Sequence, residues 1–215
     1  SLVLVNGLFI TFEGGDGVGK STQLRLLAER IAASGREVVT TREPGGTELG
    51  VEIRNIVLHH RGEIAPRAEA LLYAADRAHH IETLVRPALD RGAVVVQDRY
   101  FDSSVAYQGA GRVLAANEIR DISMWATGNL IPDLTVLLDL DPSAARVRLD
   151  ADDKVFDRLE SEKAEFHTRV RDGFLALAAD EPARWLVIDA TLSVDQISQT
   201  IGERVDALLG VWFSR

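Results

Sequence analysis

The chain has no cysteine, which excludes disulfide bonds and metal sites built from thiolates. Absence of cysteine fits a reducing compartment, so we expect a cytoplasmic protein. No apolar run approaches the ~20 residues that a membrane span needs, and the first residues show no signal-peptide pattern. We therefore expect neither a membrane segment nor a secretory leader.

Positive charge is also in deficit, with 24 Lys and Arg against 33 Asp and Glu and a formal net charge of −9. The electrostatic field of such an acidic protein repels a nucleic-acid polymer, whereas a nucleotide monomer needs only a few convergent cations. The sequence shows no linker, internal repeat or low-complexity segment. Its 215 residues are enough for one substantial core, so we expect a single domain over residues 1–215.

What the sequence does contain is a phosphate-binding pattern in the stretch Phe12–Thr22. G-x-x-x-x-G-K-[ST] is matched by Gly14, Gly19, Lys20 and Ser21. Glycines allow a backbone curl that turns N–H groups onto phosphate oxygens, and the helix that follows adds its positive dipole end. Lysine then reaches the β- and γ-phosphates, and the Ser21 hydroxyl is a candidate ligand of Mg²⁺. The predicted ATP-binding residues are Gly14, Gly15, Asp16, Gly17, Val18, Gly19, Lys20, Ser21 and Thr22.

Apolar strands alternate with amphipathic helices along the whole chain. Continuous apolar or β-branched runs predict five strands at Leu8–Phe12, Glu37–Thr41, Ala93–Gln97, Leu134–Leu140 and Trp185–Asp189. Helical periodicity predicts helices at Ser21–Ala33, Thr47 to about His59, Pro66–Leu89, Ala115–Thr127, from Pro142 onward, Glu160–Ala179 and Val194–Leu209. This alternation predicts an α/β protein of the P-loop NTPase fold, a five-stranded parallel sheet covered by helices on both faces. The charged, poorly periodic segment Ala151–Arg158 predicts a mobile loop.

Polar residues follow two of the predicted strands at their carboxyl ends, where open α/β sheets bind ligands. Arg42 lies in the tight loop Thr41–Thr47, and Asp98 and Arg99 follow Ala93–Gln97. An aspartate in this position is suited to hold the water shell of Mg²⁺ beside a P-loop.

The segment Pro66–Leu89 is apolar around more of its circumference than one core-facing stripe requires. The excess predicts a second buried face, against a ligand or another subunit. Tyr73 and Arg77 lie four residues apart on one helix face, where such a pair is either a surface stack or part of a site.

Four motifs in order resemble the thymidylate kinase family in its bacterial form. They are Glu13-Gly14…Asp16-Gly17-Val18-Gly19-Lys20-Ser21, Thr41-Arg42-Glu43-Pro44-Gly45-Gly46-Thr47, Asp98-Arg99-Tyr100…Ala106-Tyr107-Gln108-Gly109, and Asp157-Arg158-Leu159-Glu160. The likeness covers nearly the whole chain. It implies transfer of the γ-phosphate of ATP to dTMP with Mg²⁺, carried out by a homodimer.

Carried over by motif, the resemblance also implies roles in a dTMP site. Asp16 would face the dTMP sugar near the 3′-hydroxyl, and Arg42 and Arg99 would bind the dTMP phosphate. The remaining roles fall to residues of two other segments: Tyr73 stacks on thymine, Arg77 meets thymine O4, Ser104 and Gln108 contact the base edge, and Tyr107 crowds the 2′ position of the sugar.

The P-loop itself carries no arginine between Gly14 and Gly19. In the bacterial form the resemblance implies that arginines of a lid, here about residues 146–160, supply that charge. The candidates are Arg146, Arg148 and Arg158, and the motif favours Arg158. The expected catalytic set is Lys20, Arg99, Arg158 and Asp16, with Ser21 and Asp98 at the metal.

Two rival functions remain open from the residues alone. A kinase of free deoxynucleosides on a related fold would need a base to activate a neutral hydroxyl and fewer arginines around the acceptor. A nucleotide-binding protein without catalytic activity would bind ATP and transfer no phosphate.

Overall fold

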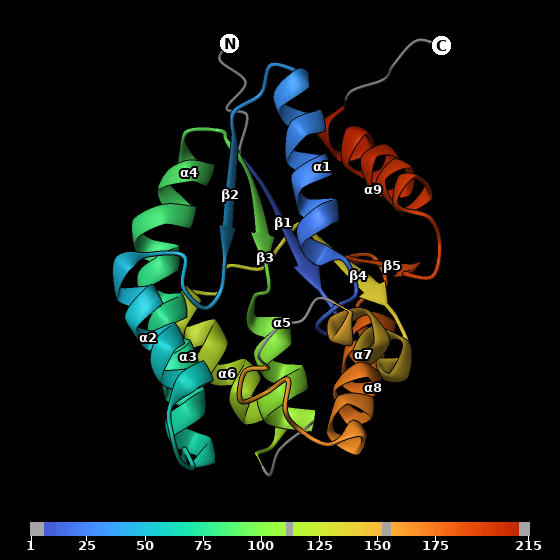
Figure 1. Ribbon diagram of the computed structural model, residues 1–215. Helices are drawn as coiled ribbons and strands as arrows, with labels where there is room; N and C mark the ends of the chain where they lie inside the picture. Colours follow the sequence, from blue (N-terminus) through green and yellow to red (C-terminus); the bar gives the residue numbers. More distant parts are fainter. Residues whose placement is uncertain (1–6, 111–113, 152–155, 211–215) are drawn as a thin grey trace.

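The computed structural model describes residues 7–110, 114–151 and 156–210. Its centre is one sheet of five parallel strands in the order β2-β3-β1-β4-β5 (Figure 1). The strands are β1 (Leu8–Glu13), β2 (Val38–Arg42), β3 (Val94–Asp98), β4 (Leu134–Asp139) and β5 (Trp185–Asp189). This confirms the predicted fold class. Strands β2 and β3 are each displaced by one residue from their predicted bounds, and β1 and β4 differ from theirs by one residue at the carboxyl end.

Helices follow each strand, as the alternating pattern predicts. The α-helices are α1 (Lys20–Ala33), α2 (Glu48–His59), α3 (Pro66–His80), α4 (Arg86–Asp90), α5 (Phe101–Ser104), α6 (Ala116–Thr127), α7 (Pro142–Asp150), α8 (Ala164–Asp180) and α9 (Val194–Leu209). Two π-helical turns interrupt them, η1 (Ile81–Val85) between α3 and α4, and η2 (Val105–Ala110) after α5. In the part of the chain that the structure describes, no helix is both long and apolar enough to cross a membrane.

Alternate residues of the central strands enter separate cores on the two faces of the sheet. Ile10, Val94 and Val96 pack with residues of α1 and α9, whereas Phe9 and Val95 pack with residues of η1, α5 and α6. Figure 1 shows α1 and α9 together on the near side of the sheet. Continuous apolar strands were the sequence feature that predicted cover on both faces.

Two helices differ from their predictions by more than a single residue at one end, each for a local reason. The long helix over Pro66–Leu89 contains the π-turn η1, and Pro87, just beyond it, has no N–H to continue the regular α-helical hydrogen bonding. The helix predicted from Glu160 begins only at Ala164. The Asp157 carboxylate accepts hydrogen bonds from the backbone N–H groups of Leu159 and Glu160 at 2.8 Å each, which closes a turn ahead of the helix.

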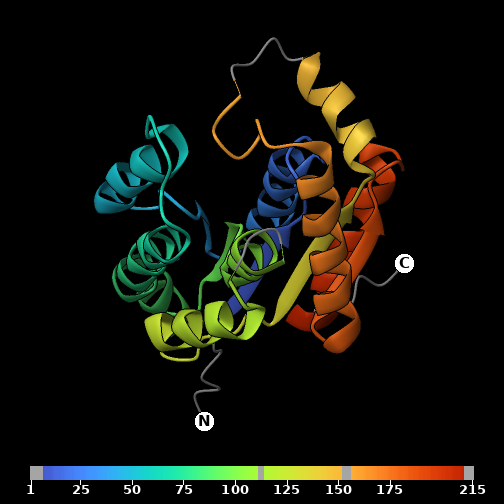
Figure 2. The same ribbon diagram turned by 90° about the horizontal axis from the view of Figure 1, so that it is seen from below.

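Seen from below, along the strands toward their carboxyl ends, the elements leave α2 and α3 on one side and α7 and α8 on the other (Figure 2). The loops after β1, β2 and β3 lie between these two groups. The segment expected as a lid joins α7 to α8 on this side, and its residues 152–155 lie outside the described part of the chain.

Candidate active site

The loop between β1 and α1 has the backbone shape that its glycines predict. Gly14, Gly17 and Gly19 have φ values of 131°, 77° and 100°, in the region that side chains with a Cβ rarely adopt. A Cβ on Gly17 would lie 2.9 Å from the Ala145 carbonyl oxygen and 2.8 Å from Leu149 Cγ. The curl is therefore fixed both by its own dihedral angles and by α7 packed against it.

Lys20 folds back across this loop. Its Nζ donates to the carbonyl oxygens of Gly15 at 2.7 Å and Gly14 at 3.3 Å. Burial lowers the pKa of the Lys20 ammonium group, and the Arg99 charge lowers it further. Because an anion beside it would favour the charged form, the ammonium group is suited to a phosphate partner.

A hollow beside the loop combines a hydroxyl and a carboxylate suited to a hard cation. Lys20, Ser21, Thr22, Arg42 and Asp98 are among the residues that line it. Asp98 Oδ1 is buried and has no hydrogen-bond partner in the described part of the chain. Among the described residues no group of three or more His, Cys, Asp or Glu side chains is placed to hold a metal ion. A cation here would therefore take most of its ligands from phosphate oxygens and water, which is how Mg²⁺ is commonly bound.

Arg99 lines both this hollow and a second pocket, and side chains from the P-loop, α5 and η2 hold it. Its Nη2 donates to Asp16 Oδ1 at 2.7 Å and to the Tyr107 hydroxyl at 3.4 Å, and its Nη1 donates to Ser103 Oγ at 3.0 Å. Its φ of 65° is unusual for a residue with a side chain and turns the chain sharply after β3. Asp16, Arg99 and Tyr107, assigned to one site by resemblance, are thus in direct contact.

Glu13, a buried carboxyl that sequence reasoning did not assign, supports this sharp turn. It accepts hydrogen bonds from the backbone N–H of Tyr100 and from the Ser103 hydroxyl. Burial raises the pKa of Glu13 to about 8, with a further contribution from the negative charge of Asp102. A glutamate between an apolar strand and a P-loop was the available sequence indication, but its partners are 87 and 90 residues away.

The second pocket brings together residues predicted to contact the base and the sugar of dTMP. Tyr73 and Arg77 come from α3, Ser104 from α5, and Tyr107 and Gln108 from η2; all five line it. Pro44, Leu58 and Leu159 complete apolar parts of the wall. The helical pair Tyr73 and Arg77 is therefore part of a concave site rather than a surface stack.

Like Tyr107, which accepts from Arg99, three more of these polar side chains are bound to protein groups. Arg77 Nη2 donates to Ser104 Oγ at 3.0 Å, so Ser104 contacts the arginine assigned to thymine O4. Gln108 Nε2 donates to Glu69 Oε1 at 3.1 Å. Burial raises the pKa of Tyr73 above its usual range, as does the nearby Glu69 carboxylate, so this ring stays a neutral phenol.

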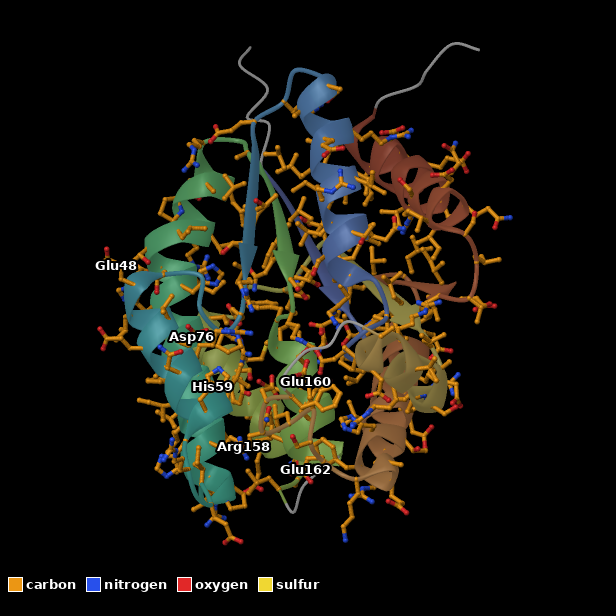
Figure 3. The ribbon with its side chains drawn as sticks, in the orientation of Figure 1. Glu48, His59, Asp76, Arg158, Glu160 and Glu162 are labelled. Carbon is orange, nitrogen blue, oxygen red and sulfur yellow. The ribbon has the colours of Figure 1, made fainter. Side chains whose placement is uncertain are left out.

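The lid arginines lie in different places. Arg148 lines the phosphate hollow and donates to the Ala190 carbonyl at 3.0 Å, whereas Arg146 bonds Asp150 at 3.0 Å and lies over the Phe156 ring. Arg158 instead binds the Glu69 carboxylate on α3 and, through Nε, the Val57 carbonyl at 2.9 Å. Figure 3 shows Arg158 and Glu160 on the loop that crosses in front of the lower helices, with Arg158 nearer α2 and α3.

A further cation, Arg54 of α2, was missed from the sequence. It lines both hollows, its Nη1 donates to the Pro44 carbonyl at 3.1 Å, and its side chain packs against Gly45. Burial lowers the pKa of Arg54, as does the nearby Arg42 charge. Its sequence indication was weak, because a charged residue between the buried Ile53 and Val57 is usual on a helix that covers a core.

Comparison with known proteins gives one consistent family. The family model described as thymidylate kinase matches residues 12–201. The thymidylate kinase of Clavibacter michiganensis subsp. michiganensis (strain NCPPB 382) is 69% identical over 205 residues, covering 95% of this chain and 97% of its own. The thymidylate kinase of Leifsonia xyli subsp. xyli (strain CTCB07) is 66% identical, covering 93% of this chain and 95% of its own. That of Bifidobacterium longum (strain NCC 2705) is 53% identical, covering 95% of this chain and 100% of its own. The chain belongs to the thymidylate kinase family.

Proposed function

We propose that this chain transfers the γ-phosphate of ATP to dTMP, giving dTDP and ADP. The observation that carries the proposal is the junction of the two hollows: Asp16, Arg54 and Arg99 line both, as do Glu43 and Asp157. A donor triphosphate on the P-loop and an acceptor nucleotide in the second pocket would therefore meet at the same arginines.

The expected chemistry is alignment and charge neutralisation. The dTMP phosphate is already a nucleophile, so no strong general base is needed. Lys20 and a lid arginine would gather the charge that spreads over the transferring phosphoryl group. Arg42 and Arg99, joined by Arg54, would offset the repulsion between the two anions and hold the attack in line. Asp16 would orient the sugar, and in this structure it already fixes Arg99 through the 2.7 Å bond.

Mg²⁺ is the cofactor that we propose, with Ser21 and Asp98 as the protein groups nearest to it. The unpartnered buried oxygen of Asp98 and the hydroxyl of Ser21 are oxygen donors, as this hard cation requires. When bound with ATP, the ion would neutralise charge on the β- and γ-phosphates. Lys20 and the backbone N–H groups of the loop would bind the same phosphates from the other side.

We also propose a homodimer, although the reason differs from the sequence argument. Several apolar residues of Pro66–Leu89 are buried within the chain, including Ala70, Ala74, Ile81 and Val85. Leu71 remains 56% exposed beside a groove formed with Leu114 and Ile122, and Trp125 of α6 is 83% exposed. Large exposed apolar groups on adjacent helices favour a second copy as their cover. Sedimentation at micromolar concentration should give about twice the chain mass of 23.5 kDa.

Because both proposed substrates are charged nucleotides, we place the protein in the cytoplasm, and cell fractionation tests this. The function itself is tested by coupled ADP release with dTMP, with thymidine and with no acceptor. We expect ADP only with dTMP. ADP with thymidine would favour a deoxynucleoside kinase, and ATP binding without transfer to any monophosphate would favour a non-catalytic protein.

A further inference from the structure

Arg77 is almost completely enclosed, with 2% of its surface exposed. Its guanidinium group has five N–H donors. Nε donates to Glu43 Oε2 at 2.8 Å, Nη1 to Ser123 Oγ at 3.1 Å, and Nη2 to Ser104 Oγ at 3.0 Å and to the Tyr100 carbonyl at 3.4 Å. One N–H of Nη1 is left without an acceptor among the described residues, and Arg77 lines the acceptor pocket.

Glu43 is the charged partner of this arginine, and a second layer holds it. Its other oxygen, Oε1, accepts from His80 Nδ1 at 2.9 Å, and His80 Nε2 lies 2.7 Å from Thr41 Oγ1. Glu43 and His80 are both buried. With Nδ1–H assigned as the donor to the carboxylate, the chain of contacts runs from Thr41 through His80 and Glu43 to Arg77.

These contacts connect the loop after β2 to α3 at close range. A Cβ on Gly46 would lie 2.5 Å from His80 Nε2 and 2.7 Å from Thr41 Oγ1, so a side chain at this position would displace the pair. A separate contact, from the Gly45 N–H to Asp76 Oδ1 at 3.2 Å, joins the same loop to the same helix. Figure 3 shows Asp76 where α3 passes the end of β2.

We infer that Glu43, supported by His80, is a positioning residue that determines base specificity by fixing the direction of the free Arg77 N–H. The inference rests on the proposed function, in which Arg77 reads the O4 side of thymine. A guanidinium held at Nε by a carboxylate cannot rotate about its long side chain, so its remaining donor stays aimed at an acceptor. A base with an amino group at that position then meets a fixed donor.

Loss of the Glu43 carboxylate would release Arg77 from its fixed orientation but leave the Arg77 side chain in the pocket. In Glu43→Gln, one end of the amide would present an N–H either to Arg77 Nε–H or to His80 Nδ1–H, setting donor against donor. The arginine would then take several orientations, and the base with an amino group would be rejected less. Sites that depend on a hydrogen bond lose discrimination when its geometry is relaxed.

The experiment measures kcat/KM for dTMP and for dCMP in purified full-length wild type and Glu43→Gln. We expect the dTMP-to-dCMP ratio to fall at least tenfold in Glu43→Gln, because a relaxed donor distinguishes the bases less well. The matched control is Asp76→Asn. It changes another buried carboxyl of α3 that contacts the same loop, but it retains an oxygen to accept from the Gly45 N–H. We expect its ratio to equal that of wild type.

A second pair of variants keeps the test decisive should Glu43→Gln fail to fold. His80→Leu removes the donor to Glu43, whereas His80→Asn returns an N–H near the position of Nδ1. We expect a reduced ratio in His80→Leu and partial recovery in His80→Asn, a difference that loss of stability alone would not produce. Unchanged ratios in folded Glu43→Gln and His80→Leu would overturn the inference. A wild type that transfers no phosphate to dTMP would instead overturn the proposed function.

Discussion

The phosphate hollow and the acceptor-base pocket lie side by side but are built differently. One wall of the phosphate hollow is a continuous segment, Asp16–Thr22, that belongs to a loop shaped by three glycines with positive φ; the other lining residues come from later parts of the chain. The base pocket is formed by side chains from α2, α3, α5, η2 and four loops, held by contacts over long sequence distances. A local site depends on backbone conformation, whereas a dispersed one depends on the whole fold to bring its groups together.

Lys20→Ala tests the local site and should have the largest effect. It removes a charge aimed at the transition state, so kcat should fall by about 10³-fold or more. Because the hydrogen bonds of the Lys20 ammonium group within the described residues go only to carbonyl oxygens of its own loop, the fold should survive. Steady-state assay with dTMP, with circular dichroism as a control for folding, measures this. Activity within tenfold of wild type in a folded variant would contradict the role of Lys20.

Arg77→Ala tests the dispersed site and should change selectivity. Arginine has donors and no acceptor, and cytosine carries a donor amino group where thymine has O4. Wild type should prefer dTMP. Its kcat/KM for dUMP should be lower, because one missing methyl changes kcat/KM by only about 10–200-fold. It should barely use dCMP, because a hydrogen-bond mismatch lowers kcat/KM by as much as about 10⁴-fold.

The Arg77→Ala variant should lose most of the discrimination against dCMP, measured as kcat/KM for the three acceptors. Its control is Ser123→Ala, which removes one Arg77 contact and leaves the Glu43 pair. Discrimination that survives in full without Arg77 would show that another group reads the base.

The same contrast explains what the sequence could and could not predict. The P-loop and the five strands followed from local patterns, and the placing of Asp16 and Arg99 in one site followed from the family resemblance. The sequence did not predict Arg54, Glu13 and His80 as part of the site, because each lies in a segment whose pattern is also that of an ordinary helix covering the core or of a strand end. Their partners are set by tertiary packing, as in the 37-residue separation of His80 from Glu43.

Residues of the expected lid line both the phosphate hollow and the acceptor-base pocket. Arg158→Ala tests which of the two sites Arg158 serves. We propose that Arg158 acts on the transferring phosphoryl group, so kcat should fall about tenfold while KM for dTMP changes less. The matched variant is Arg148→Ala, whose arginine already lines the phosphate hollow. If Arg158→Ala only raises KM, Arg158 supports the acceptor pocket through Glu69, which also binds the pocket residue Gln108 in this structure.

The smallest expected effect concerns Glu13, which links the end of β1 to the turn that carries Arg99. The pKa of its carboxyl is about 8 in the folded chain against an ordinary value of 4.5, chiefly because of burial. Between these values the folded state keeps a proton that the unfolded state releases, so the contribution of Glu13 to stability is full below pH 4.5 and decreases as pH rises toward 8. Glu13→Gln, a neutral isostere, should remove this decrease. As pH rises from 4.5 to 8, the free energy of unfolding of Glu13→Gln should therefore increase relative to that of wild type by at least about 1 kcal/mol. Urea titrations of both proteins across the range measure the difference, and parallel curves would show that Glu13 ionises in the folded state as it does in water.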